Sequence, residues 1–131
     1  MHDWTLQEAT DALPRVRGIV QRIRELVATA RERAEHPGGG NGTRPSSNGH
    51  GPKTRPDAER ELRTLVEELT NEGIVVRDPA RGLIDFPARA PSGRQYLLCW
   101  LDGEDAIEWW HWPDAGFAGR TPITAPPDQS V

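Results

Sequence analysis

The chain has 131 residues, of which 35% are hydrophobic, and a formal net charge of −4. This size and composition suit one small domain with a modest core. The charge is uneven: residues 1–36 hold six arginines and six acids, 37–56 hold three cations and no acid, and 57–131 hold seven arginines and 14 acids. Because the acidic C-terminal part repels phosphates, we expect no binding to nucleic acid.

The sequence also argues against a membrane or secreted protein. It has no apolar run near ~20 residues and no cationic-then-apolar leader. The single cysteine excludes a disulfide within the chain and suits a reducing compartment. We therefore expect a cytoplasmic protein with no membrane partner.

Residues 5–35 are predicted to form a long, kinked helix. Thr5-Leu6-Gln7-Glu8 is a capping box. Pro14 would remove a hydrogen bond inside the helix, so we expect a short helix over 5–12 and then a kink or a restart. Apolar residues recur over four heptads, as is typical of a coiled coil: Leu6, Ala9, Leu13, Val16, Val20, Ile23, Val27, Ala30 and Ala34.

Two further segments complete a predicted helical hairpin. Residues 36–55 are rich in Gly, Pro and Ser and are expected to form a flexible loop. Residues 56–72 are predicted to form a second helix with proline at N1, and Gly73 suits its C-terminal cap. Its acids can face the arginines of the first helix, in antiparallel packing. The first helix is longer than the second, so the extra part of its apolar stripe has to be covered by the β-part or by a second subunit. This favours a homodimer through the heptad helix.

The C-terminal half is predicted to form a small, mainly antiparallel sheet of about four strands within residues 74–123. The expected strands are 74–77, 83–86 (ending at Pro87), 95–101 and 106–112. Residues 124–131 are expected to be a disordered tail. The sequence thus predicts a single α+β domain over residues 1–131, with a helical hairpin and a small sheet.

The residues from 95 to 123 are where we expect a site, because they hold four of the five tryptophans and the only cysteine. Asp85 lies between Ile84 and Phe86 and needs a partner if it is buried, for which Arg81 or Arg120 is expected. Arg120 follows a glycine-rich loop and could bind a carboxylate or phosphate. The candidate ligand-binding residues are Asp85, Trp100, Glu104, Trp110, His111, Asp114 and Arg120.

A metal site is the second interpretation, with Cys99, His111 and Asp114 as candidate ligands to zinc or iron. Asp114 lies three residues after His111 and could orient its imidazole. However, a two- or four-residue loop between the last two strands would place Cys99 and His111 on opposite faces. Only an odd loop or a bulge would bring them together.

Several segments resemble one bacterial family, the domain of unknown function DUF2203. The matching segments are Gly82 to Ala88, Leu98 to Trp100, Gly103-Glu104, Trp110-His111 and Asp114 to Ile123. Members of that family are sometimes labelled cell-division initiation proteins. The resemblance implies no mechanism.

Taken together, the sequence predicts a non-catalytic oligomerising and binding module without a cofactor. Its Trp/His/Arg-rich sheet end would bind a protein partner or a small anion. The alternative is a metal-dependent, hydrolase-like enzyme that uses Asp85, Glu104, His111 and Asp114.

Overall fold

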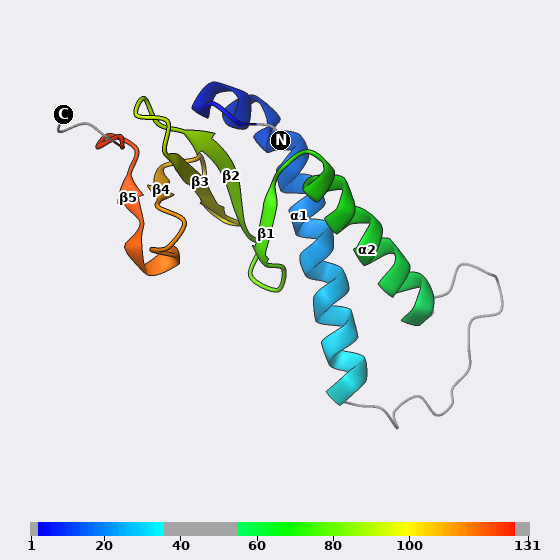
Figure 1. The fold of residues 1–131 in the computed structure, drawn as a ribbon. Coiled ribbons are helices and arrows are strands. Elements are labelled where there is room, and N and C mark those ends of the chain that lie inside the picture. Colours follow the sequence, from blue (N-terminus) through cyan, green and yellow to red (C-terminus); the bar gives the residue numbers. More distant parts are fainter. Residues whose placement is uncertain (1–2, 36–54, 128–131) are drawn as a thin grey trace, which may run out of the picture.

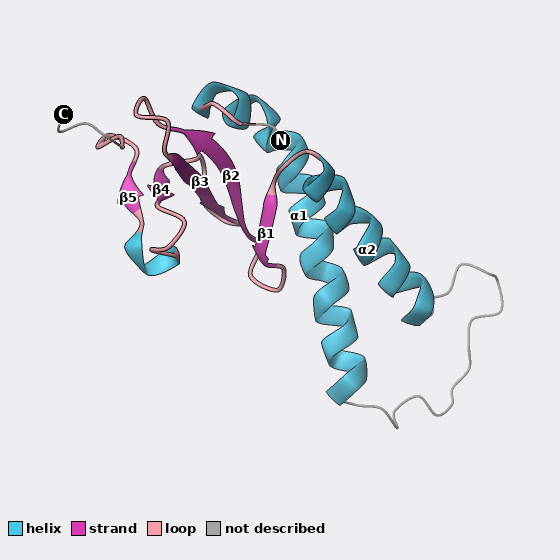
Figure 2. Ribbon diagram, in the orientation of Figure 1, coloured by secondary structure: helices cyan, strands magenta, loops and turns pink. Residues whose placement is uncertain are grey.

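The computed structural model describes residues 3–35 and 55–127 and has the predicted α+β architecture. Two helices, α1 (Leu6–Glu35) and α2 (Arg55–Asn71), precede a sheet of five strands and a short 3-10 helix, η2 (Phe117–Gly119). Figure 2 shows α1 and α2 on one side of the molecule and the strands, with η2 beside β5, on the other. The loop was predicted over residues 36–55; residues 36–54 lie outside the described residues, and Arg55 belongs to α2.

Helix α1 runs without interruption through Pro14, so it does not restart there. Its N-terminus carries the predicted capping box: the Glu8 N–H donates to Thr5 Oγ1 over 3.0 Å, and the Thr5 N–H donates to Glu8 Oε1 over 3.1 Å. Figure 1 shows the first turns, in the darkest blue, at an angle to the rest of the helix. A proline ring inside a helix is a usual cause of such a bend.

Helices α1 and α2 lie side by side and antiparallel (Figure 1). Arginines of the first helix face acids at the second, as expected. The Arg22 guanidinium donates to both carboxylate oxygens of Glu61, over 2.8 and 2.9 Å, and Arg15 does the same with Glu72, over 2.8 and 2.6 Å. Gly73 follows α2 with a φ of 87°, a conformation that favours glycine at a helix C-terminus.

The strands pair in chain order, and every pair is antiparallel. They are β1 (Val75–Asp78), β2 (Leu83–Arg89), β3 (Gln95–Leu101), β4 (Trp109–His111) and β5 (Thr121–Pro122). Several details differ from the prediction: β1 is shifted by one residue, β2 continues past Pro87, β4 covers only Trp109–His111, and β5 is an additional strand. Pro87 is tolerated because its carbonyl accepts the Trp4 N–H over 2.6 Å. Its backbone therefore faces away from β3, and the missing N–H removes no bond to that strand.

One face of the sheet forms the core with α1. The buried core residues of α1 are Ala9, Leu13, Val16, Val20 and Ile23, and those of the sheet include Ile84, Phe86, Leu98, Trp100 and Trp110. The heptad stripe is therefore buried within one chain from Ala9 to Ile23. The opposite face, here called the outer face, carries the odd-numbered residues of β2, β3 and β4.

The described part of the predicted tail, residues 124–127, folds back on the sheet. The Trp110 indole donates to the Ala125 carbonyl over 2.9 Å, and Pro127 is buried. Residues 128–131 lie outside the described part. Neither α1 nor α2, the helices of the described ranges, has the length and apolar character needed to cross a bilayer.

Candidate metal and ligand site on the outer face

The register between β3 and β4 places Cys99 and His111 on the same face. Cys99 lies opposite Trp109, and Leu97 lies opposite His111. The connection runs from Asp102 to Glu108, an odd number of residues, whereas a loop of two or four residues was expected. The prediction that the two side chains point apart is therefore wrong, and the odd-loop alternative is the one observed.

Asp85 completes a cluster with these two residues. It lies opposite Cys99 across the β2–β3 ladder. His111 Nε2 is 3.1 Å from Asp85 Oδ1 and 3.2 Å from Oδ2. One ligand atom from each of the three residues lies within 4.8 Å of the others, and all three residues are buried. The sheet thus gathers a carboxylate, a thiol and an imidazole that are far apart in the sequence.

The charge of Asp85 is balanced by Arg77, whose Nε donates to Asp85 Oδ2 over 2.6 Å. Arg81 and Arg120, the expected partners, lie elsewhere, and that prediction is wrong. The Arg81 guanidinium lies 5.1 Å from the centre of the Phe117 ring, and Arg120 pairs with Glu104. The reason is local, because Arg77 is on the strand next to Asp85.

Arg77 was not predicted as a site residue from the sequence, and it lies at a β-bulge. Val76 lies opposite Ile84 and Asp78 lies opposite Leu83, so Arg77 is the extra residue on β1. The available signal was a strand that ends in arginine and is joined by a short turn to a strand with a buried acid. Opposite charges on neighbouring strands often pair.

The orientation of His111 follows from its contact with its own backbone. Nδ1 lies 2.8 Å from the Trp112 carbonyl oxygen. A carbonyl oxygen can only accept, so Nδ1 carries the hydrogen and Nε2 faces Asp85. Asp114, the expected orienting group, is exposed and does not belong to the cluster.

The Cys99 thiol is held in its neutral form. Two effects raise the pKa of this thiol to about 12: burial, which is the larger, and the nearby negative charge of Asp85. A thiol with such a pKa is almost fully protonated at neutral pH and is therefore a poor nucleophile.

The other candidate residues have structural partners. Trp100 and Trp110 belong to the core on the opposite face of the sheet. Glu104 stabilises its turn: its Oε1 accepts from the Leu101 N–H over 2.9 Å and from Arg120 Nη2 over 2.8 Å. Arg120 lies over the Trp109 and Phe117 rings, and its side chain is only 11% exposed. Its guanidinium is therefore largely covered by these rings and by Glu104.

One cavity adjoins the cluster, and a second, larger one is lined in part by Arg77. The smaller has a volume of about 100 Å³ and is lined by Arg77, Leu83, Asp85, Cys99, His111, Pro113, Gly116 and Phe117. The larger, here called the groove, has a volume of about 460 Å³ and is lined by Val66, Thr70, Gly73, Ile74, Val75, Val76, Arg77, Pro87, Gln95, Leu97 and Pro113. Arg77 and Pro113 line both, so the two cavities are neighbours.

Residues 3–123 match the model of a family described as "Uncharacterized conserved protein (DUF2203)". The match spans nearly the whole chain. The chain belongs to the DUF2203 family. A search of curated proteins and of solved structures found no match.

The DUF2203 match covers every residue that builds the site. Arg77, Asp85, Cys99 and His111 come from β1, β2, β3 and β4, all within the matched range. The family description assigns no activity, so the chemistry of the site has to be inferred from its geometry.

Proposed function

We propose that this DUF2203 protein is a non-catalytic binding module for a small ligand with an apolar body and a carboxylate. The ligand would lie in the groove with its carboxylate on Arg77. This is the small-anion alternative of the sequence analysis, with Arg77 in place of Arg120 as the anchoring cation.

The unused hydrogen-bonding capacity of Arg77 carries this proposal. Its Nε is bound to Asp85, but Nη1 and Nη2 have no hydrogen-bond partner among the described residues. The side chain is 42% exposed, and it lines the groove. A guanidinium fixed through Nε presents its two terminal nitrogens as a fork, which matches the two oxygens of a carboxylate.

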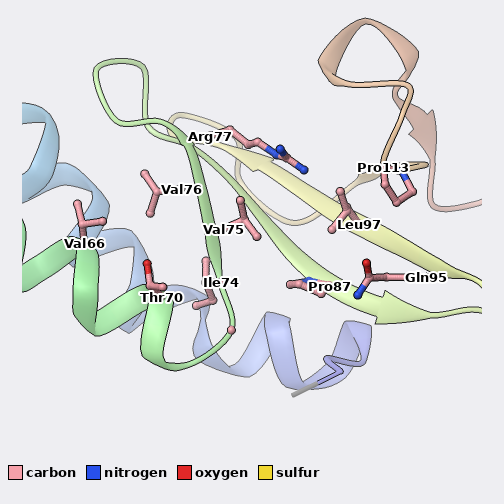
Figure 3. A pocket seen from close by; sticks show the side chains of 11 residues that line it. Val66, Thr70, Ile74, Val75, Val76, Arg77, Pro87, Gln95, Leu97 and Pro113 are labelled. Atoms are coloured by element: carbon pink, nitrogen blue, oxygen red, sulfur yellow. The ribbon is translucent and has the colours of Figure 1, made fainter. Parts of the chain in front are cut away.

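The walls of the groove explain why the ligand should have an apolar body. In Figure 3, Arg77 and Pro113 lie at one end and Pro87 and Gln95 at the other, with Val75 and Leu97 between them. An apolar chain that starts at Arg77 would therefore lie on aliphatic side chains. Each methylene that it buries should contribute about 0.8 kcal/mol.

The hydrolase-like alternative has less support. It requires Asp85, Glu104, His111 and Asp114 to act together, but Glu104 is bound to Arg120 and Asp114 is exposed. The remaining pair, Asp85 and His111, is buried in a cavity of about 100 Å³, which is small for a substrate. The binding module therefore accounts for more of the geometry.

A series of straight-chain carboxylates tests the proposal. Acetate, butyrate, hexanoate and octanoate should bind with rising affinity in isothermal titration calorimetry, by about fourfold per added methylene, because each adds buried apolar area. Arg77→Gln should weaken octanoate binding at least about tenfold, and Arg77→Lys should restore part of it. Circular dichroism would confirm that both variants are folded.

Arg63→Gln is the matched control, because Arg63 is exposed on α2 and does not line the groove. It should bind octanoate as the unchanged protein does. Equal affinity for acetate and octanoate, or equal loss in the Arg63 and Arg77 variants, would contradict the proposal.

For assembly we propose the homodimer that the heptads suggest, formed through the α1–α2 hairpin. The support is incomplete burial: Ile19, Val27, Leu62, Leu65 and Val66 pack on the core but are only partly buried. A second hairpin could cover them in a four-helix arrangement.

Light scattering should give the mass of two chains for the unchanged protein, and the double variant Leu62→Gln with Val66→Gln should reduce the mass to that of one chain. A mass of one chain for the unchanged protein at high concentration would rule the dimer out.

A further inference from the structure

We propose that Asp85, Cys99 and His111 bind one divalent transition-metal ion, with zinc as the best fit to this ligand set. The inference is separate from carboxylate binding in the groove and stands whether or not that binding occurs. Oxygen, sulfur and imidazole nitrogen are together the ligands that zinc takes in proteins.

The distances in the cluster suit a shared ion. Zinc bonds to these atoms are about 2.0–2.3 Å long, so ligand atoms around a tetrahedral zinc lie roughly 3–4 Å apart. His111 Nε2 and Asp85 Oδ1 are 3.1 Å apart, and the whole set lies within 4.8 Å. The largest separation that this limit allows exceeds the tetrahedral range by less than about 1 Å.

The tautomer of His111 points to a cation at the same place. Because Nδ1–H donates to the Trp112 carbonyl, the Nε2 position faces both oxygens of Asp85. The Nε2 lone pair would repel the Asp85 carboxylate unless a proton or a metal ion lay between the two groups. Metal-binding histidines commonly donate their other ring N–H to a carbonyl, which fixes the ring as it is fixed here.

The surrounding groups leave room for an ion. Arg77 bonds to Oδ2 of Asp85, so Oδ1, which faces His111 Nε2, is the oxygen that would bind a metal while Oδ2 is held in the second shell. The Cys99 thiol must lose its proton to the solvent. A bound zinc ion drives that loss, because coordination deprotonates a thiol outright.

The small cavity would provide a fourth, open position. Its lining includes all three proposed ligands together with Arg77. Three protein ligands with a free position are the arrangement of zinc sites that bind an exogenous group, whereas purely structural sites use four protein ligands. A water molecule or an anion held by Arg77 could occupy it.

Cobalt(II) is the probe of choice, because it replaces zinc and its thiolate complex absorbs in the near ultraviolet. The full-length protein, stripped with a chelator and dialysed, should take up one cobalt ion per chain and develop this absorption. Zinc should then displace cobalt and abolish it. Cys99→Ala should remove the absorption and weaken zinc binding by more than about a hundredfold, beyond the range of second-shell effects.

Asp114→Asn is the matched control, because Asp114 is close to His111 in sequence but outside the cluster. It should bind cobalt as the unchanged protein does. Asp85→Asn should weaken binding, and tryptophan fluorescence would show whether it stays folded. Absence of the thiolate absorption in the unchanged protein, or equal zinc affinity in Cys99→Ala, would overturn the proposal.

Discussion

Asp85 is the residue on which the outer face depends, because its carboxylate contacts both a permanent cation and an imidazole. It is fully buried, and a buried carboxylate without partners would be strongly destabilising. Arg77 provides a cation whose own side chain remains partly in water. The Asp85 charge is thus compensated by Arg77, and Asp85 still lines the small cavity.

The pH dependence of stability should report on Cys99 in the metal-free protein. Its folded pKa of about 12 is above the value of 9.0 for a free thiol, so the folded state holds the proton more tightly. This stability is fully present below about pH 9 and is lost as the pH rises toward 12. Between pH 9 and 10 the protein should lose about 1 kcal/mol relative to Cys99→Ala, because the unfolded thiol is already half ionised at pH 9.

Urea unfolding at pH 7.5, 9 and 10, with a chelator present, would measure this difference. The comparison with Cys99→Ala removes the contribution of other groups that titrate in the same range, including Tyr96, whose pKa is raised by burial. Parallel pH profiles for the two proteins would show that the thiol titrates as it does in the unfolded chain.

At the scale of elements, the turn between β1 and β2 fixes the sheet against α1. Gly82 has a φ of 76°, and its carbonyl accepts the Asp102 N–H over 3.0 Å. An added Cβ would lie 2.7 Å from Asp102 Cβ, 2.9 Å from Arg24 Cδ and 3.0 Å from Val20 Cγ1. The backbone of this turn therefore approaches both α1 and the end of β3 more closely than any side chain would allow.

Gly82→Ala and Gly93→Ala should separate this close approach from backbone strain. Both positions have positive φ, so each alanine should cost about 1–2 kcal/mol for the backbone alone. At Gly93 nothing lies within 4 Å of the added Cβ, whereas at Gly82 the contacts should add about 1–3 kcal/mol. Urea unfolding of both variants would test the difference, and equal losses would show that the turn relaxes.

At the scale of the whole molecule, Trp4 links three parts of the fold. Its backbone N–H donates to the Pro87 carbonyl on β2, and its indole donates over 3.1 Å to the Glu72 carbonyl that follows α2. Its ring packs edge-on against Phe86, with 5.1 Å between centres. The start of the chain thus connects α1, the end of α2 and the sheet.

Trp4→Ala should destabilise the protein by about 3–5 kcal/mol, as expected for loss of a buried aromatic side chain. Leu6→Ala is the control, because Leu6 is 38% exposed and its loss should cost less than about 0.5 kcal/mol. Thermal and urea unfolding would measure both. A loss at Trp4 no larger than that at Leu6 would mean that the N-terminal segment does not contribute to the cooperative unit.

Features that depend on neighbours in the sequence could be predicted without a structure. The capping box at Thr5, the end of α2 at Gly73 and the third strand over 95–101 all appear where the sequence placed them. Each arises from local hydrogen bonding or from a short apolar period, which act over a few residues. The α+β class follows from the order of these elements.

The candidate site could be predicted only in part, because it depends on register. Asp85, Cys99 and His111 were each selected for their chemistry, but whether they meet depends on the connection over 102–108 having an odd length. A shift of one residue would turn the imidazole to the other face.

The two helices, the first four strands, their order, the family and the residue types able to carry chemistry could all be recognised in the sequence. The three-dimensional fold was needed to show that Cys99 and His111 share a face, that Arg77 and not Arg81 or Arg120 pairs with Asp85, and that the heptad stripe is buried within one chain from Ala9 to Ile23. The physical reason is that elements form from local interactions, whereas register, bulges and burial are set by packing between segments far apart in the chain.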